Sequence, residues 1–291
     1  MLSFPYESVS GHITRIYAFL TEMIYLVEGD KEVMLIDSGS GLGSLKKTVD
    51  EILESHGNLD KPMKILLTHG HIDHALGTWE FERRGIPVFM SRMDDYVYRE
   101  NMKDSFREAF MPLTDFEGHG TYDPAEDYFP ASPWESFHDL TENASFDLGG
   151  VVITAYSCPG HTKGSMVFLI DEEDGDKYLL TGDAANSFTF LYQNYSTSVE
   201  EFEDSLKALK EKVDGKYNKI LNSHGTGVEK MGLLESLIKI CEEIKAGKTA
   251  EVPFFYNGSS GLIACQPESE NLNGNIVFHP ERIWKKDTII S

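Results

Sequence analysis

The chain has 291 residues, with 48 acidic against 26 basic residues and a formal net charge of −22. This charge disfavours nucleic acid and anionic membranes as partners, because both require positive charge at the contact surface. No apolar run is long enough to span a bilayer, and three widely spaced cysteines without a Cys-x-x-Cys pair argue against a disulfide framework, so we expect a globular cytoplasmic protein.

The first third of the chain predicts strands followed by a helix. Three short segments rich in β-branched and aromatic residues are expected as strands, at residues 12–20, 23–28 and 32–36. The last of them ends in Asp37-Ser38-Gly39, which we interpret either as a loop that faces a site or as turn chemistry alone. The helix that follows has Leu42, Leu45, Val49, Ile52 and Leu53 at helical spacing.

A histidine-rich stretch directly follows an apolar run of the kind that makes a short buried strand, Ile65-Leu66-Leu67. Because side chains in extended backbone repeat every second residue, His69 and His71 point the same way. Gly70 between them adds no bulk and lets the backbone bend. The two imidazoles are therefore expected to aim at one point.

Asp73 and His74 continue this stretch at the start of a helix expected over residues 75–84. Their carboxylate and imidazole face a second point beside the first. Two such pairs are typical of a metal site that takes its remaining ligands from elsewhere in the chain. The alternative interpretation is a polar loop that happens to be rich in histidine.

Residues 91–141 differ in character from the segments around them. They are rich in glycine, proline and aromatic residues, with one helix expected near residues 92–99. The segment is too long for an ordinary connection, so we expect a lid or binding loop, a satellite subdomain that packs its own aromatic residues, or both. Because no repeat or linker composition interrupts the chain, we predict one domain over residues 1–291 with this insertion.

The second half of the chain again places polar residues at the ends of predicted strands. Strands are expected at residues 151–156, 166–170, 178–180 and 219–221. His161 follows the first of them, Asp183 the third and His224 the fourth. Each residue taken singly is more readily a structural or turn residue. Together with the histidine-rich stretch they predict one site, because such strand ends meet at one edge of a sheet.

Two helices and a tail of strands complete the prediction. Ser198 opens the first helix, with Glu201 in the position of a capping box. Apolar residues at helical spacing from Met231 to Ile244 predict the second helix. After Glu251 the sequence predicts two or three strands.

These motifs together resemble the metallo-β-lactamase-fold hydrolases. The motifs that carry the resemblance are His-x-His-x-Asp-His at 69–74, Pro-Gly-His-Thr at 159–162, Thr-Gly-Asp at 181–183 and Ser-His-Gly at 223–225. They stand in the order found in that family, over roughly residues 12–225. The resemblance implies a mixed α/β (α+β) fold, a four-layer αβ/βα sandwich, and it is specific for the fold rather than for the substrate.

The resemblance also implies a centre for two divalent cations. The implied ligands are His69, His71 and His161 for the first metal, Asp73, His74 and His224 for the second, and Asp183 as a bridge. Imidazole and carboxylate suit zinc, with iron or manganese as alternatives. Two cations that share a carboxylate hold a water and lower its pKa. Asp73 is the catalytic candidate that orients this nucleophile or shuttles a proton, and Asp37 would support the ligands.

Three functions fit this set of residues. The first is a dinuclear hydrolase that uses a metal-bridged hydroxide on a small-molecule ester, thioester, lactone or phosphoester. The second is a persulfide dioxygenase-like oxidoreductase with one iron on His69, His161 and Asp183. The third is a binding protein with a structural metal, which is disfavoured because four ligands normally close a structural site.

Departures from subfamily patterns narrow the first function. Asp183 stands near the point where the best-known β-lactamase subclass has cysteine, which disfavours antibiotic hydrolysis. The strand-rich tail differs from the basic helical domain of glyoxalase II-like thioesterases. Lactonases that cleave acyl-homoserine lactones often place a tyrosine over the metals, and Tyr192 and Tyr195 are candidates for it. The alternative for both is core packing with Phe188 and Phe190.

Overall fold

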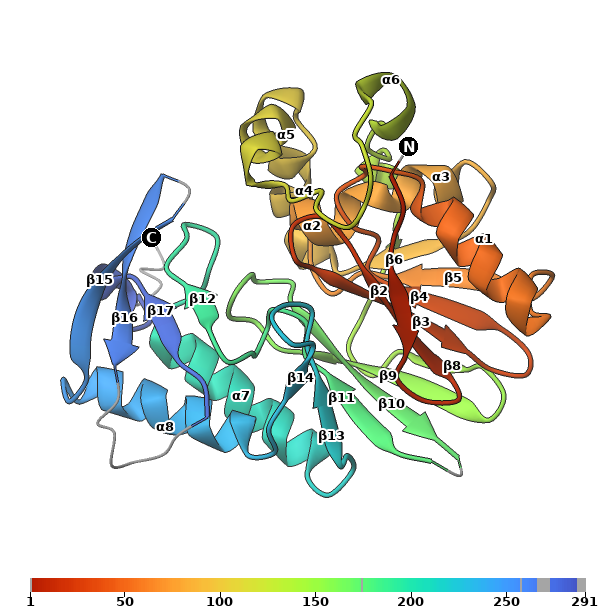
Figure 1. The fold of residues 1–291 in the computed structure, drawn as a ribbon. Coiled ribbons are helices and arrows are strands. Elements are labelled where there is room, and N and C mark those ends of the chain that lie inside the picture. The colour runs from red at the N-terminus through yellow and green to blue at the C-terminus, as the bar shows by residue number, and fades with distance from the viewer. Residues whose placement is uncertain (1, 174, 257, 266–272, 287–291) are drawn as a thin grey trace.

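The computed structural model describes residues 2–173, 175–256, 258–265 and 273–286, and its strands form three sheets. The first sheet contains, in spatial order, β1 (Tyr6–Ser8), β2 (Ile13–Tyr17), β3 (Met23–Glu28), β4 (Val33–Ile36), β5 (Met63–Leu66), β6 (Val88–Met90) and β7 (His138–Asp139). β1 to β4 pair antiparallel and β4 to β7 pair parallel. The carboxyl ends of β4, β5 and β6 therefore lie at one edge of this sheet (Figure 1).

The other two sheets are formed by the second half of the chain. The second contains β14 (Val228–Glu229), β13 (Lys219–Leu221), β11 (Lys177–Leu180), β10 (Met166–Glu172), β9 (Val151–Ser157) and β8 (Ser145–Asp147). The third contains β12 (Thr189–Leu191), β17 (Ile276–Phe278), β16 (Ser259–Cys265) and β15 (Ala250–Tyr256). β15, β16 and β17 confirm the strands predicted for the tail.

The helices begin and end at clear sequence signals. They are α1 (Leu45–His56), α2 (Ile72–Ala75), α3 (Trp79–Glu82), α4 (Asp95–Asn101), α5 (Asp104–Phe110), α6 (Pro124–Asp127), α7 (Val199–Val213) and α8 (Leu233–Lys245). α1 ends at Gly57, whose φ of 74° suits a left-handed cap. α7 begins with the predicted capping box between Ser198 and Glu201. Among the described residues, no helix combines the length and apolar character needed to cross a membrane.

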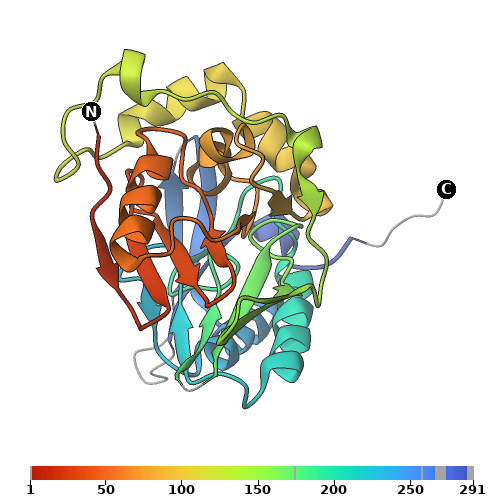
Figure 2. The ribbon, with the colours of Figure 1, turned by 90° about the vertical axis from the view of Figure 1, so that its right-hand side faces the viewer.

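Three buried cores separate four layers, which confirms the predicted sandwich. One core lies between the first sheet and the α1 side, a second between the first two sheets, and a third between the second sheet and the α7–α8 pair. The alternation of side chains along β3 explains how one sheet borders two cores. Ile24 and Leu26 face the first core, whereas Tyr25 and Val27 face the second. Figures 1 and 2 show α1 and the α7–α8 pair on opposite outer sides of the sheets.

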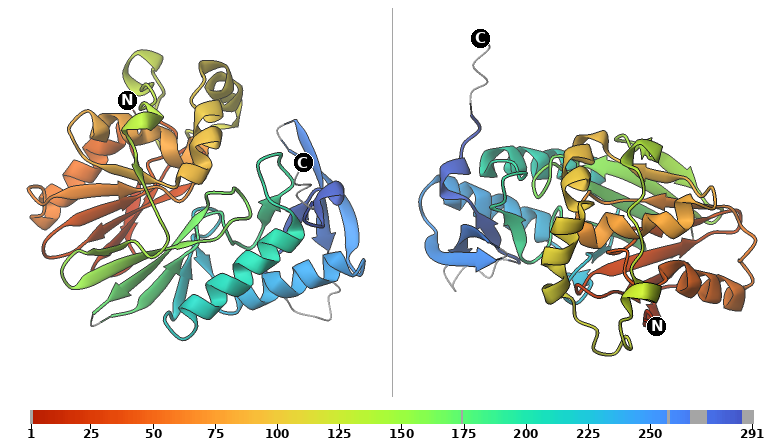
Figure 3. Two further views of the ribbon diagram at one scale, coloured as in Figure 1. Left: turned by 180° about the vertical axis from the view of Figure 1, so that it is seen from behind. Right: turned by 90° about the horizontal axis from the view of Figure 1, so that it is seen from above.

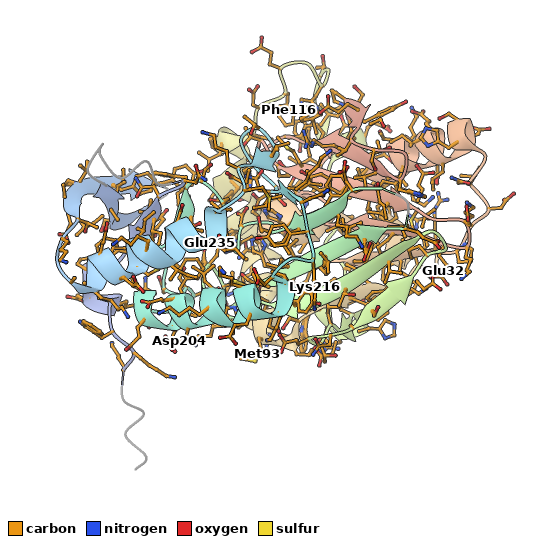
Figure 4. All side chains as sticks on the ribbon, turned by 90° about the horizontal axis from the view of Figure 1, so that it is seen from below. Glu32, Met93, Phe116, Asp204, Lys216 and Glu235 are labelled. Carbon is orange, nitrogen blue, oxygen red and sulfur yellow. The ribbon has the colours of Figure 1, made fainter. Side chains whose placement is uncertain are left out.

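The outer helix layer is polar on its exposed face. Figure 4 shows Asp204 of α7 and Glu235 of α8 on the surface of this layer. Lys210 of α7 lies 3.3 Å from Glu235, so an ion pair joins the two helices where they pack side by side. Such exposed pairs contribute about 0–1 kcal/mol each, and the buried leucine and isoleucine side chains beneath them hold the layer in place.

The insertion packs its aromatic residues against the core shared by the first sheet and α1. The aromatic side chains packed there are Phe106, Phe110, Phe116, Tyr122, Tyr128 and Trp134, with Phe137 buried among them. The insertion therefore shares a core with the main fold, and its assignment as a lid or as a satellite subdomain stays a prediction. Seen from above in Figure 3, the helices of the insertion lie between the C-terminal sheet and α1. The insertion therefore also stands beside the edge of the first sheet where the predicted site residues gather.

The prediction of one continuous helix over residues 75–84 is wrong. The segment begins earlier, as α2, passes through a 3₁₀ turn over Leu76–Thr78, and continues as α3. The reason is the close approach of Gly77 to the loop after β4. A Cβ at Gly77 would lie 1.9 Å from the carbonyl oxygen of Ser38, and the Gly77 N–H donates to the carbonyl of Gly39 at 2.9 Å. This contact brings the Asp37 loop against the histidine-rich stretch.

Two other predicted boundaries also move. The strand predicted over residues 12–20 ends at Tyr17, and a turn over residues 18–22 follows it. The helix predicted from Met231 begins at Leu233, and Met231 is half exposed. Gly232, with a φ of 86°, forms the irregular start of that helix.

Candidate metal centre

The predicted site residues come from four loops that meet at one edge of the sandwich. His69, His71, Asp73 and His74 follow β5 and enter α2, His161 lies between β9 and β10, Asp183 follows β11, and His224 follows β13. All of them fall into groups whose ligand atoms lie within 4.8 Å of one another. The structure thus brings together all seven residues that the sequence pointed to.

The first group consists of three buried histidines. The Nε2 atom of His69 lies 2.8 Å from the Nδ1 atom of His71, and the Nε2 atom of His161 lies 3.0 Å from that same Nδ1 atom. The exposed fractions of the three residues are 1%, 8% and 3%. Three imidazole nitrogens therefore converge on one point away from solvent.

Two of these imidazoles are held in a definite tautomer by their outer nitrogens. His161 donates its Nδ1–H to the carbonyl of Phe190 at 2.9 Å. The Nδ1 atom of His69 lies 3.0 Å from the Thr68 hydroxyl, which in turn donates to Asp37. The Nε2 lone pairs of both histidines are then directed to the centre, as metal-binding imidazoles require.

The second group combines a carboxylate with two imidazoles. The Oδ2 atom of Asp73 lies 3.5 Å from the Nε2 atom of His74 and 3.4 Å from that of His224. The Nε2 atoms of His74 and His224 are 3.3 Å apart. His74 is fixed from outside, because its Nδ1–H donates to Asp37 at 2.8 Å.

Asp183 stands between the two groups. Its Oδ2 atom lies 3.7 Å from the Nε2 atoms of both His74 and His161, and 3.4 Å from that of His224. Its Oδ1 atom is buried and has no hydrogen-bond partner among the described residues. An unpaired buried carboxylate oxygen is costly unless a ligand satisfies it. Converging imidazole lone pairs beside such an oxygen fit divalent cations of the zinc type.

The electrostatics of the two groups differ. Burial lowers the pKa of His69, His71 and His161, and the neighbouring imidazoles add to the effect at His69 and His71. These histidines are therefore neutral, the form that binds a cation.

The second group holds opposite charges. Burial opposes the charged form of His74, but Asp73, Asp37 and Asp183 raise its pKa well above the usual value. Burial likewise opposes the charged form of His224, but Asp183 and Asp73 raise its pKa to about 10. Burial alone would raise the pKa values of the Asp73 and Asp183 carboxyl groups, but the facing imidazoles hold them well below their usual range. A cation entering this group would displace imidazole protons.

Asp37 anchors the loop that carries the histidines. Its Oδ1 atom accepts the Thr68 N–H at 2.7 Å, and its Oδ2 atom accepts from the Thr68 hydroxyl and from His74. Asp37 has a φ of 64°, a conformation that is uncommon for a residue other than glycine. The backbone conformation and the buried carboxylate together support the interpretation of this loop as site-facing.

Asp94 is a functional residue that the sequence reasoning missed. It is fully buried, and its carboxylate accepts from the Gly70 N–H at 2.9 Å, the Thr162 hydroxyl at 2.7 Å and the Gly164 N–H at 2.7 Å. It thus ties the His69–His71 loop to the His161 loop. Its place at the start of the insertion, among several other acidic residues, gave no signal in the sequence.

A cavity of about 380 Å³ opens above the ligands. Tyr195 lines it, and its ring packs edge-on against His71 with the centroids 4.7 Å apart. Tyr192 is instead buried against Phe190 and Phe254. The two tyrosines that the sequence could not separate therefore have different places, one in the cavity and one in the core.

Comparison with known families gives one match that covers most of the chain. A family model described as the metallo-beta-lactamase superfamily matches residues 19–242. All seven residues of the candidate centre lie within this match.

Individual relatives are more distant. The chain is 28% identical over 211 residues to the acyl-coenzyme A thioesterase MBLAC2 of Gallus gallus, covering 69% of this chain and 71% of that protein. It is 22% identical over 217 residues to the atrochrysone carboxyl ACP thioesterase of Passalora fulva, covering 75% of this chain and 52% of the other. The mono-zinc structure of the metallo-beta-lactamase FIM-1 from Pseudomonas aeruginosa has a TM-score of 0.55 at 18% identity, with 82% and 95% covered. That similarity shows the fold.

Proposed function

The chain belongs to the metallo-beta-lactamase superfamily, and on that premise we propose that it is a dinuclear metal-dependent hydrolase of a small-molecule ester or thioester. The observation that carries the proposal is the meeting of two ligand groups, His69–His71–His161 and Asp73–His74–His224, on either side of Asp183. One closed set of four ligands would serve a structural metal. Seven ligands beneath an open cavity support a catalytic centre instead.

The residues of this chain have separate roles in that reaction. When bound, two divalent cations would lower the pKa of a water molecule and polarise the substrate oxygen under attack. Asp183 would hold both cations, and the carboxylate of Asp73, which faces the cavity, would orient the water or accept its proton. Asp37 and Asp94 keep the ligand loops in place through buried hydrogen bonds.

The choice of ester or thioester rests on the relatives and on the cavity. Two relatives of low identity are named as thioesterases. The cavity carries no lysine or arginine among its described lining residues, so a charged group of the substrate away from the two cations would find no cationic side chain of these types there. The substrate screen also includes lactones, because Tyr195, one of the two candidates for a tyrosine over the metals, lines the cavity and packs edge-on against His71.

The test combines metal analysis with one substitution. We expect close to two zinc or manganese ions per chain after supplementation, together with turnover of an ester or thioester in a screen that includes lactones and phosphodiesters. Asp183→Ala should remove that turnover and lower the metal content. Asp176→Ala is the matched control, because Asp176 is a surface aspartate that pairs with Lys219. Less than about one metal per chain in the unaltered protein would count heavily against the proposal.

The same measurement separates the two other functions. A persulfide dioxygenase-like enzyme would hold one iron and consume oxygen with a persulfide while hydrolysing nothing. A protein with a structural metal would bind metal and turn nothing over. The completeness of the Asp73–His74–His224 group, which a single iron on His69, His161 and Asp183 would leave unused, supports the two-metal hydrolase.

A further inference from the structure

The cavity above the ligands has two walls that come from distant parts of the chain. One wall is built by the insertion, and the other by β12 and the C-terminal sheet. In Figure 1 the insertion and the C-terminal sheet stand on either side of the loops at the centre of the molecule. A volume of about 380 Å³ suits a small molecule.

The wall from the insertion is apolar. Phe106 and Phe110 of α5 stack on each other with their centroids 4.8 Å apart and an angle of 25° between the rings. Leu20, from the turn between β2 and β3, and Ile72 of α2 line the same cavity. This wall offers ring faces and aliphatic carbon to a ligand.

The opposite wall is aromatic as well. Phe188 and Phe190 lie edge to face at 5.6 Å, and Tyr256 of β15 lies 6.1 Å from Phe190. Phe254 packs behind them, 5.5 Å from Phe190. Phe188 and Tyr256 line the cavity and remain 38% and 41% exposed, so part of their apolar surface is left open by the ring contacts. Burying such surface against an apolar ligand is favourable.

No lysine or arginine side chain lines this cavity among the described residues. The buried guanidinium of Arg107, on the same helix as Phe106 and Phe110, is committed elsewhere, because it donates to the carbonyl of Phe129 at 2.8 Å and stacks over the Tyr128 ring at 4.1 Å. The polar residues that line the cavity include Gln193 and Asn222, whose side-chain amides are neutral. Neutral amides offer an anion no opposite charge.

We propose that this cavity binds the uncharged, apolar acyl arm of an ester or thioester, with Phe106, Phe110, Phe188, Phe190 and Tyr256 as its walls. The assignment rests on the proposed function, since it places the reacting carbonyl over the ligands. In the reaction, the oxygen of water forms a bond to the carbonyl carbon and the bond from that carbon to sulfur or oxygen breaks. The leaving group takes up a proton, and a carboxylic acid is released.

The first test uses N-acetylcysteamine thioesters, which carry no phosphate, with the zinc-loaded enzyme. From acetyl to butyryl, kcat/KM should rise about 15-fold, because each of the two added methylenes is worth about fourfold when buried. Succinyl, which replaces the terminal methyl of butyryl by a carboxylate, should react at least tenfold more slowly than butyryl. Equal rates for the two would overturn the proposal.

The second test changes the walls. Phe188→Ala and Phe110→Ala should each lower the octanoyl-to-acetyl ratio of kcat/KM about tenfold. Phe116→Ala is the matched control, since Phe116 belongs to the same insertion but stacks on Tyr122 at 5.1 Å and does not line the cavity. A ratio unchanged in both wall variants, or lowered equally by the control, would overturn the assignment.

The third test does not depend on turnover. Calorimetry with metal-free protein should show binding of octanamide and at least tenfold weaker binding of octanoate, and Phe188→Ala should weaken the binding of octanamide. If octanamide binds in this way but neither an ester nor a thioester is hydrolysed, the proposed function fails while the ligand class of the cavity stands. If thioesters are hydrolysed without any dependence on chain length and octanamide does not bind, the proposed function stands and the assignment of the cavity fails.

Discussion

The floor and the walls of the cavity are held by different forces. The floor consists of ligand loops fixed by buried carboxylates, in which Asp37 and Asp94 each accept three or more hydrogen bonds from the chain. The walls consist of aromatic rings that touch one another and stay partly open to solvent, as Phe188 and Tyr256 do. Directional bonds fix distances to a few tenths of an ångström, whereas ring packing tolerates changes of shape.

This difference suggests that the floor and the walls have separate functions, metal binding and substrate specificity. A centre for two cations needs fixed distances between ligand atoms, which the floor supplies. Specificity for an acyl arm needs only apolar volume, which the walls supply and which can change without disturbing the floor. Substitutions in the floor should therefore decide whether any substrate reacts, and substitutions in the walls should decide which substrate reacts.

The largest expected effect is that of His71→Ala. Its Nδ1 atom is the point on which His69 and His161 converge, so the first group loses its central ligand. We expect kcat/KM to fall about 10³-fold or more for every substrate, because several kcal/mol of transition-state stabilisation depend on the cation. Steady-state kinetics with short and long acyl substrates and elemental analysis would measure it. A fall confined to long acyl chains would instead assign His71 to the walls and contradict the distinction between floor and walls.

The second largest effect is expected for Asp94→Ala. This substitution leaves the N–H groups of Gly70 and Gly164 and the Thr162 hydroxyl without their acceptor. Removing such an outer partner typically lowers metal affinity about 10–100-fold. Unpaired buried donors should also lower the free energy of unfolding by about 2–3 kcal/mol. Zinc competition with a chelating dye and urea denaturation would measure the two effects.

Asp95→Ala is the control for that variant. Asp95 is the next residue along the chain and lies 3.5 Å from Arg92 near the surface. We expect it to change the zinc affinity less than threefold. If Asp94→Ala behaved in the same way, Asp94 would be a packing residue rather than part of the floor.

The floor was predictable from the sequence for the same reason that it is rigid. His69, His71 and Asp73 lie within one short stretch, and strand ends in this fold deliver His161, Asp183 and His224 to the same edge. Local periodicity and spacing therefore carried most of the information. The four-layer sandwich was predictable through the same motifs.

The walls and the supports of the floor were not predictable. Phe110 and Phe188 are 78 positions apart in the chain, and nothing local to either shows that they line one cavity. Asp94 has no sequence signature, because its role depends on the tertiary approach of Gly70 and Gly164. The break at Gly77 likewise follows from contact with the Ser38 carbonyl rather than from helix propensity.

A smaller effect is expected at Glu22, in the turn that places Leu20 and Thr21 at the cavity. Glu22 is 1% exposed, and burial together with the charge of Asp73 raises its pKa to about 7 from 4.5. The folded state thus keeps a proton that the unfolded state releases, so stability falls as pH rises from about 4.5 to 7. Glu22→Gln removes this loss, and metal-free protein should gain on the order of 1–3 kcal/mol at pH 8 and little at pH 5.

Urea denaturation at the two pH values would measure this gain. Glu54→Gln, on the exposed face of α1, is the control and should show no such difference between pH values. A gain of equal size at pH 5 and pH 8 would mean that the substitution acts through packing or a hydrogen bond rather than through the buried charge. In that case Glu22 would be a neutral part of the turn.

The smallest effect is that of Ser198→Ala, which tests whether a change outside the cavity alters stability without altering activity. Ser198 caps α7 directly after the chain has passed through the wall residues Phe188, Phe190 and Tyr195. Loss of the cap should cost about 1 kcal/mol and lower the Tm by about 2–4 °C. Ser198→Thr, which keeps a hydroxyl, should recover most of the loss. Because α7 supplies none of the seven ligands, kcat/KM should stay within twofold. A much larger fall in activity would show that the wall segment and the floor are coupled. The hydrogen bond from His161 Nδ1–H to the Phe190 carbonyl, 2.9 Å long, would provide that coupling.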